Sequence, residues 1–338
     1  MLRRSGTDAH AWGLHRFILA VQAGGIMARP ILIDCDPGTD DAIALFLALG
    51  NPALDVRAVT VAGGNVGLHH TLRNARALVG LTGRAIPVIA GADRPLLGSF
   101  TSETRVHGEN GIGGVDLPDG PPAAPGLAAD AIRQALRQAG PADQPGAGLT
   151  LVGIGPATNL ALALATEPAL AANIAEIVLM TGAWAEGNVT PAAEFNAWSD
   201  PEALAIVLAC ARPITLATLH LTSQALCTPA RIAALQDGPG TCRAAAAAIM
   251  ATVPPTRRLA YAGHPQHDAC AIAWLLAPEI FTHRDVHAVV DCTNGPGRGQ
   301  TIIDRWSRLA LPPNARLLDT IDPDRFFALL AESIAHLP

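Results

Sequence analysis

Short apolar runs alternate with helical patterns along nearly the whole chain, and this alternation constrains the fold more than any other feature of the sequence. The pattern predicts strands at residues 30–35, 56–62, 87–91, 148–154, 177–181 and 214–219. It predicts helices between them at 40–49, 68–81, 128–139, 156–165 and 201–210. Because the strands are continuous apolar runs, both faces of their sheet must be buried. We therefore expect an α/β fold with a mainly parallel central sheet that helices cover on both faces.

The rest of the chain continues this pattern within one domain. We expect a mainly helical segment from about 229 to 276, strands near 286–292, 301–303 and 315–318, and a closing helix from residue 323. The 338 residues suffice for one large domain, and no internal repeat divides them. We assign residues 27–338 to one Rossmann-like catalytic domain and residues 1–26 to an N-terminal extension outside the fold. In such sheets, the active site is expected at the carboxyl ends of the strands.

The charged residues exclude several kinds of chemistry. All 23 residues of the Lys+Arg count are Arg, so the chain has no lysine for a Schiff base or for a P-loop. The formal net charge of −6 offers no basic field for nucleic acid or for an anionic membrane surface. No apolar run reaches the ~18 residues that a membrane span requires. We therefore expect neither a nucleic-acid partner nor a membrane partner.

The six cysteines are scattered, without the spacing of a metal finger or a redox motif. Most of them lie in apolar stretches, where a free thiol behaves as a small hydrophobic side chain. We interpret them as reduced residues of a cytoplasmic protein. The apolar stretch at 17–21 is too short for the core of a secretion signal, so secretion is the less favoured alternative.

Four carboxylates follow the first predicted strand within eight residues: Asp34, Asp36, Asp40 and Asp41. Helix capping explains one or two of them, because the helix dipole favours negative charge in the first turn. Four acids at this density repel one another unless a cation lies among them. All the candidate ligands are hard oxygens, and no cluster of cysteine and histidine accompanies them. We therefore expect Ca²⁺ or Mg²⁺ rather than zinc.

These acids also match the opening signature of a known family. The pattern Asp-x-Asp-x-x-x-Asp-Asp at 34–41 resembles that of the inosine–uridine-preferring nucleoside hydrolases. Further blocks follow in the family's order: VAGGNVG at 61–67, HGENGIGG at 107–114, GPATNL at 155–160, Gly-Asn at 187–188, AEFN at 193–196, DPE at 200–202 and His-Asp at 267–268. The resemblance extends from about Arg29 to the C-terminus, and the order of the blocks makes it specific.

The resemblance implies a calcium site and a ribose pocket. The calcium ligands would be Asp36, Asp41, Asp268 and the backbone carbonyl of Thr158. Asp36 would also act as general base on a metal-bound water. The ribose hydroxyls would be held by Asp40, Asn65, Asn188, Glu194 and Asn196, which are side chains suited to a polyol. Asp34 would support the site without binding the metal.

The implied reaction is hydrolysis of the N-glycosidic bond of a ribonucleoside, which gives free base and ribose in nucleoside salvage. Positive charge develops on the ribose as the base departs, and carboxylates beneath the sugar would stabilise it. His267 is the expected acid for the leaving base, since imidazole titrates near neutral pH. His107 would lie near the base. For both histidines, a purely structural role is the alternative. The resemblance also implies a homo-oligomer, either a dimer or a tetramer.

The sequence departs from the family at three positions. Gly64 replaces a residue that is often larger, and His220 lies at an expected strand end where an acid is common. Trp184 could stack on a nucleobase or fill the core. These positions leave the hydrolytic residues intact, and the preferred base stays open.

Two other functions remain as alternatives. A haloacid-dehalogenase-like phosphohydrolase also opens with Asp-x-Asp on its first strand, but those enzymes typically use a lysine, which this chain lacks. A catalytically silent nucleoside-binding protein would be expected to lose Asp36 or His267, and both are present. Release of free ribose, rather than ribose phosphate, would separate hydrolysis from phosphorolysis.

Overall fold

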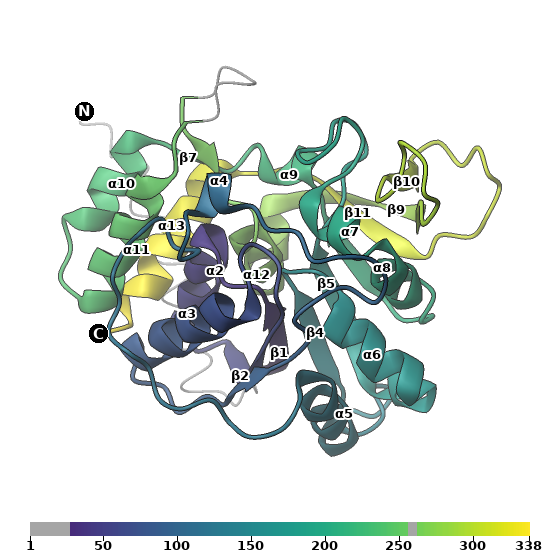
Figure 1. The fold of residues 1–338 in the computed structure, drawn as a ribbon, viewed down its shortest axis with the longest axis horizontal. Helices are drawn as coiled ribbons and strands as arrows, with labels where there is room; N and C mark the ends of the chain where they lie inside the picture. The colour runs from purple at the N-terminus through teal and green to yellow at the C-terminus, as the bar shows by residue number, and fades with distance from the viewer. Residues whose placement is uncertain (1–27, 256–261) are drawn as a thin grey trace, which may run out of the picture.

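The central sheet determines the architecture (Figure 1). The computed structural model describes residues 28–255 and 262–338, and within them nine strands form one sheet in the order β10-β9-β11-β6-β5-β4-β1-β2-β3. The parallel strands are β1 (Arg29–Cys35), β2 (Leu54–Val61), β3 (Val88–Ala90), β4 (Leu149–Gly153), β5 (Ile174–Met180), β6 (Ile214–Ala217) and β11 (Ala315–Ile321). At one edge, β9 (Phe281–Val290) runs antiparallel to β11 and to β10 (Thr301–Asp304). The expected mainly parallel sheet is confirmed.

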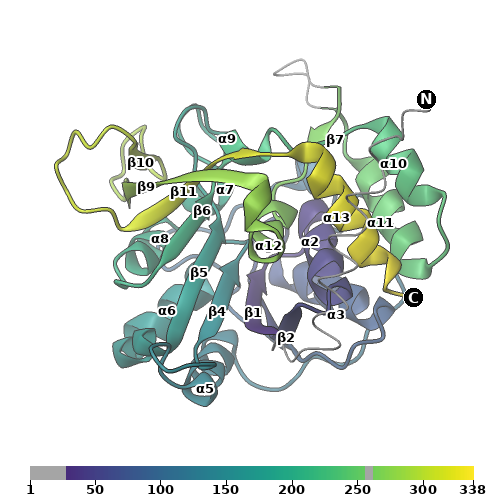
Figure 2. The same ribbon diagram turned by 180° about the vertical axis from the view of Figure 1, so that it is seen from behind.

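Helices cover both faces of the sheet (Figure 2). One face carries α2 (Thr39–Gly50), α3 (Leu68–Leu81), α11 (Thr241–Thr252), α12 (Ala269–Leu276) and α13 (Pro323–Ala335). The other face carries α5 (Ala128–Ala139), α6 (Thr158–Thr166) and α8 (Pro201–Leu208). In β1, Ile31 and Ile33 belong to one buried cluster and Leu32 belongs to the other. Because successive strand residues point to opposite faces, this alternation shows that both faces are buried.

Short elements fill the connections between these layers. They are α4 (Thr104–His107), η1 (Pro168–Asn173), α7 (Phe195–Ser199), α9 (Leu219–Thr222), α10 (Pro229–Gln236), η3 (Pro278–Ile280) and a small sheet of β7 (Leu226–Cys227) with β8 (His264–Pro265). β8 interrupts the segment that was expected to be mainly helical. The strand expected at 214–219 was wrong at its end, because β6 stops at Ala217 and His220 lies in α9.

The cysteines, the expected absence of membrane spans and the N-terminal extension can also be compared with the structure. All six cysteines are free, and four of them are buried. In the described part of the chain, every helix is too short or too polar to cross a membrane. The extension assigned to residues 1–26 lies outside the described residues.

Candidate active site

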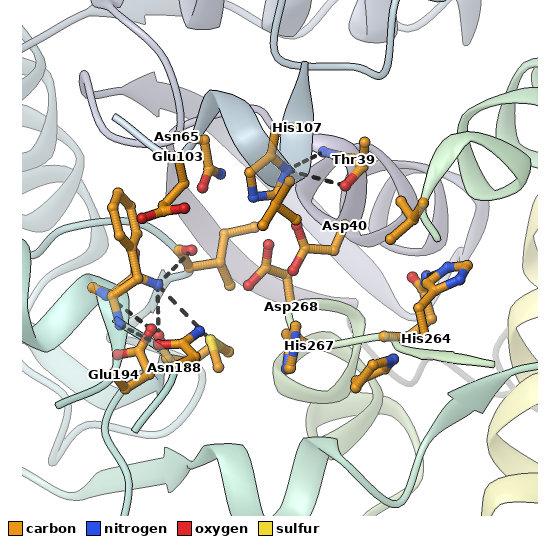
Figure 3. Close-up of a pocket in the computed structure, with 18 of the residues that line it drawn as sticks. Thr39, Asp40, Asn65, Glu103, His107, Asn188, Glu194, His264, His267 and Asp268 are labelled. Atoms are coloured by element: carbon orange, nitrogen blue, oxygen red, sulfur yellow. Dashed lines mark hydrogen bonds between the residues drawn. The ribbon is translucent and has the colours of Figure 1, made fainter. Parts of the chain in front are cut away.

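A pocket with about 160 Å³ of free volume lies at the carboxyl ends of the parallel strands. Eight residues singled out from the sequence line it: Asp40, Asn65, His107, Asn188, Glu194, Asn196, His267 and Asp268. Figure 3 shows the carboxylates of Asp40 and Asp268 at the centre, with His107 and His267 on opposite sides of them. The fold therefore brings together side chains that are more than 200 residues apart in the sequence.

The acids of the first strand–helix turn meet a third acid from the C-terminal half of the chain. Asp40, Asp41 and Asp268 each offer a carboxylate oxygen, and these oxygens lie within 4.8 Å of one another. Burial and the charge of Asp40 raise the pKa of Asp41 and of Asp268 above the usual range. The backbone N–H groups of Asp36 and Gly38 donate to Asp41 at 3.1 and 2.9 Å and offset this repulsion only in part.

Asp36 lies beside this cluster and is fully buried. Its Oδ2 accepts a hydrogen bond of 2.6 Å from the backbone N–H of Asn65, whereas its buried Oδ1 has no hydrogen-bond partner among the described residues. Burial and the neighbouring Asp41 raise its pKa well above the usual range. An orphaned carboxylate oxygen next to three clustered carboxylates is chemically suited to a divalent cation with oxygen ligands.

Gly64, where the sequence departs from the family pattern, makes room for the Asp36 carboxylate. A Cβ at Gly64 would lie 2.0 Å from Asp36 Oδ2, and a Cβ at Gly155 would lie 2.5 Å from Oδ1. Both glycines are therefore needed for the close approach of their loops to this side chain.

Of the predicted calcium ligands, only Asp268 lines the pocket, whereas Asp36, Asp41 and Thr158 lie outside its lining, as does the supporting residue Asp34. Asp34 accepts hydrogen bonds from Thr60 Oγ1 at 2.6 Å and Asn159 Nδ2 at 2.9 Å, and burial raises its pKa to about 7. Thr158 is the first residue of α6, and its hydroxyl donates to Asp200 Oδ2 at 2.7 Å. The role of the Thr158 carbonyl as a metal ligand stays a prediction.

Three asparagines present complementary atoms to a ligand. Asn196 Nδ2 donates to main-chain carbonyls at the ends of β4 and β5, both at 3.1 Å, which leaves its Oδ1 as an acceptor. Asn65 likewise uses its Nδ2, at 3.1 and 3.0 Å, on a carbonyl and a carboxylate of the acid-rich turn. The amide of Asn188 has the opposite orientation: its Oδ1 accepts a main-chain N–H of α7 at 2.9 Å, and its Nδ2 stays available to donate. A hydroxyl both donates and accepts, so this mixture suits a sugar.

Glu194 is held by its own backbone surroundings. Its carboxylate caps α7 by accepting the N–H groups of Asn196 and Ala197 at 2.8 and 3.0 Å, and it also accepts the N–H of Gly182 at 2.8 Å. Burial raises its pKa, while these hydrogen bonds act in the opposite direction. The capping role, which the sequence analysis did not foresee, fixes the orientation of the carboxylate before any ligand binds.

The two predicted histidines are anchored through Nδ1. His107 Nδ1 lies 3.2 Å from the backbone N of Thr39, and a backbone N–H can only donate, so the ring proton of the neutral form is on Nε2. His267 Nδ1 lies 2.7 Å from the hydroxyl of Thr222. Burial lowers the pKa of both imidazoles, and the charge of Asp40 opposes this shift.

The pocket also contains polar residues that the sequence analysis did not single out. His264 and Gln266 belong to the same short segment as His267, and Glu103 lies one helical turn before His107. The sequence signal that could have found Glu103 is its position four residues before His107, because residues four apart lie on the same face of a helix.

Trp184, by contrast, is not a lining residue. Its ring centroid lies 4.2 Å from that of His220 and 3.8 Å from the Arg305 guanidinium carbon. The structure therefore favours the packing alternative for this tryptophan over stacking on a nucleobase.

Known proteins share both the sequence pattern and the fold. The family model of the inosine-uridine preferring nucleoside hydrolases matches residues 31–328. A pyrimidine-specific ribonucleoside hydrolase RihA from Shewanella woodyi is 41% identical over 312 residues, which cover 91% of this chain and 98% of that protein. The RihA of Salmonella typhimurium is 40% identical over 316 residues, 92% of this chain and 99% of that one. The solved purine-preferring ribonucleoside hydrolase from Gardnerella vaginalis has a TM-score of 0.83 at 30% identity, with coverage of 91% and 98%.

Carboxylates and amides at the ends of parallel strands form the kind of pocket in which an α/β enzyme binds a polyhydroxylated ligand. The chain belongs to the inosine–uridine-preferring nucleoside hydrolase family, and it is an enzyme that hydrolyses N-glycosyl compounds. The family resemblance inferred from the sequence blocks is therefore confirmed.

The contact between Gly64 and Asp36 leads to a test. In Gly64→Ala the new Cβ collides with the carboxylate, so we expect kcat to fall by about 10²-fold, as for a displacement of ~1 Å. Gly67→Ala is the matched control in the same loop, because a Cβ there meets no atom within 4 Å and its φ of −59° suits alanine. Equal activity of the two variants in steady-state kinetics would show that Asp36 tolerates the displacement.

Proposed function

We propose that the protein hydrolyses ribonucleosides to free base and ribose with one bound Ca²⁺ per chain. The observation that carries this proposal is a pocket in which a carboxylate cluster adjoins three asparagines oriented for hydroxyl groups. The two RihA relatives are named pyrimidine-specific, which favours uridine and cytidine as substrates. The Gardnerella enzyme, at lower identity, is named purine-preferring.

The ribose would be bound by side chains that are already oriented. Asn65 and Asn196 offer acceptor oxygens, and Asn188 offers donor hydrogens. Asp40 and Glu194 add carboxylate acceptors that line the same cavity. A site that pairs every sugar hydroxyl would discriminate by ~10⁴-fold or more against an analogue that lacks one, because its buried partners are then left unpaired.

The acid cluster would supply both the metal site and the base. Asp36, Asp41, Asp268 and the Thr158 carbonyl are the proposed ligands of Ca²⁺. A bound divalent cation would offset the negative charge of the cluster and lower the pKa of a water molecule beside it. The Asp36 carboxylate would accept the proton of the attacking water, and the remaining negative charge would stabilise the positive charge that develops on the ribose.

The two histidines would serve the departing base. If the Thr222 hydroxyl donates to His267 Nδ1, the neutral ring carries its proton on Nε2, from which it can be transferred or shared. The lowered pKa makes the protonated ring a stronger acid, and it also reduces the fraction of rings protonated near neutral pH. His107 would present its Nε2–H to the base or the sugar.

The cell compartment and the assembly are also proposals. The six free cysteines favour the cytoplasm, where thiols stay reduced. Exposed apolar side chains near the sheet edge, Ile302, Trp306 and Leu309, offer area for contact between copies in a homo-oligomer.

A reducing-sugar assay tests the reaction. We expect free ribose from uridine and cytidine, without a requirement for phosphate. Asp36→Asn keeps the size of the side chain but cannot accept a proton, so ribose release should fall by at least ~10²–10⁴-fold. Ribose phosphate as the product, or a folded Asp36→Asn protein with the parent rate, would contradict the proposed chemistry.

The role of His267 can be separated from a structural one with two substrates. A poor leaving base needs protonation, whereas nitrophenol leaves as a stabilised anion. His267→Ala should therefore lose ~10²–10⁴-fold in kcat on uridine and retain most of its rate on nitrophenyl riboside. If His267 only orients the neighbouring Asp268, both rates will drop together.

Calcium binding can be measured without activity. Chelated protein should take up one Ca²⁺ per chain in calorimetry, and its Tm should rise, since saturation at 100 Kd stabilises a fold by about 2.7 kcal/mol. Asp41→Asn should abolish the rise. Asp116→Asn, a control at a side chain 97% exposed, should not. A preference for zinc, or no uptake at all, would contradict the assignment.

A further inference from the structure

The segment between β5 and α7, residues 181–194, supplies two of the proposed substrate-binding residues, Asn188 and Glu194. It contains neither helix nor sheet strand apart from one isolated bridge at Ala193. Hydrogen bonds within the segment, such as that from the Asn188 N–H to the Ala193 carbonyl at 3.1 Å, shape its turn, and contacts with the rest of the fold fix its position. Those contacts come from α7, from α9, whose Leu219 N–H donates to the Gly182 carbonyl at 3.0 Å, and from the β9–β10 hairpin, which follows more than 100 residues later in the chain.

Thr301, the first residue of β10, makes the closest of these contacts. Its hydroxyl accepts the N–H of Ala183 and donates to the carbonyl of Ala183, both at 2.8 Å. Both residues are buried, at 5% and 2% exposure. Gly182 has a φ of +80°, and a Cβ there would lie 2.7 Å from the Thr301 hydroxyl, so a glycine is required for this approach.

Two further contacts join the hairpin to this segment, and a third joins it to α8. Gln300 pairs with Ala193 at the other end of the segment. The Arg305 guanidinium lies over the ring of Trp184, with its carbon 3.8 Å from the ring centroid. Arg298 makes two hydrogen bonds of 2.8 Å to the Glu202 carboxylate in α8, and so the DPE block acquires a role.

The two residues before Ala183 contact the proposed ribose site directly. Gly182 donates its N–H to Glu194 Oε2 at 2.8 Å, and the Thr181 hydroxyl lies 3.3 Å from the same oxygen. A shift of Ala183 would therefore move a donor that orients the Glu194 carboxylate.

We propose that Thr301 is a positioning residue for substrate binding, which fixes Ala183 and thereby the Gly182 N–H that orients Glu194. Thr301 itself touches no substrate atom in this scheme. The inference rests on the proposed function, because it assigns Glu194 to ribose binding.

A pair of substitutions separates the hydroxyl from the shape of the side chain. Thr301→Val leaves both main-chain groups of Ala183 without partners, and we expect kcat/KM for ribonucleosides to fall by about 10–10²-fold, mainly through KM. Thr301→Ser keeps the hydroxyl and should restore the parent value. Thr215→Val is the matched control, since the Thr215 hydroxyl is equally buried but bonds Glu176 near the opposite end of the sheet. It should lower Tm without changing KM.

A double-mutant cycle tests the route through Glu194. In a Glu194→Gln background, the further loss caused by Thr301→Val should nearly disappear, because the carboxylate it orients is already gone. Fully additive losses, or a Thr301→Val enzyme with the parent KM, would overturn the inference while leaving the proposed function standing. If the unaltered enzyme releases no ribose from any ribonucleoside, both fail.

A second variant covers the case in which Thr301→Val does not fold. Glu202→Gln weakens the ion pair between Glu202, whose side chain is 19% exposed, and Arg298, whose side chain is 25% exposed. Because the pair is partly exposed, the protein should still fold after this change. We expect a smaller rise in KM in the same direction. An unchanged KM in this variant, together with an unfolded Thr301→Val, would count against a positioning role for the hairpin.

Discussion

The concentration of buried negative charge where β1 meets α2 and α12 is the constraint on which the rest of the active site depends. Asp36 and Asp41 are fully buried, and Asp268 is 3% exposed. Burial of unpaired carboxylates costs several kcal/mol each, even after relaxation of the protein. Hydrogen bonds from backbone N–H groups and from Asn65 offset part of this cost. The Oδ1 atom of Asp36 has no such hydrogen bond among the described residues, so its burial is not offset by the protein. A divalent cation is the group whose chemistry completes that balance.

The same turn also organises the sugar side of the pocket. Asn65 is drawn toward Asp36 and Asp41 by its main-chain N–H and its side-chain amide, which turns its Oδ1 toward a ligand. On the far side, Asn188 and Glu194 owe their orientation to α7 and to the β9–β10 hairpin. Two of the three clustered acids, Asp40 and Asp41, thus come from one strand–helix turn and the third, Asp268, from the start of α12, whereas the opposite wall also depends on the β9–β10 hairpin.

Where sequence-based expectations failed, tertiary packing overrode a local pattern. The apolar run near 214–219 predicted a strand through Leu219, but the chain turns at Thr218 into α9, which places Thr222 against His267. The aromatic ring of Trp184 near Asn188 was compatible with base stacking, yet Arg305 and His220 both pack against it. No local pattern around Trp184 could indicate a partner 121 residues away, because that contact arises only when β10 joins the sheet edge.

The sequence by itself determined the parallel α/β architecture, the acid-rich turn and eight of the residues that line the pocket. Hydrophobic periodicity and short motifs depend only on residues that are close together in the sequence, so they can be recognised without the folded structure. Only the tertiary structure decided which atoms of each side chain face the ligand: the free Oδ1 of Asn196, the free Nδ2 of Asn188 and the Nε2–H of His107. The physical reason is that an amide or an imidazole offers two different faces, and the choice between them depends on main-chain groups that only the folded chain brings within hydrogen-bonding distance.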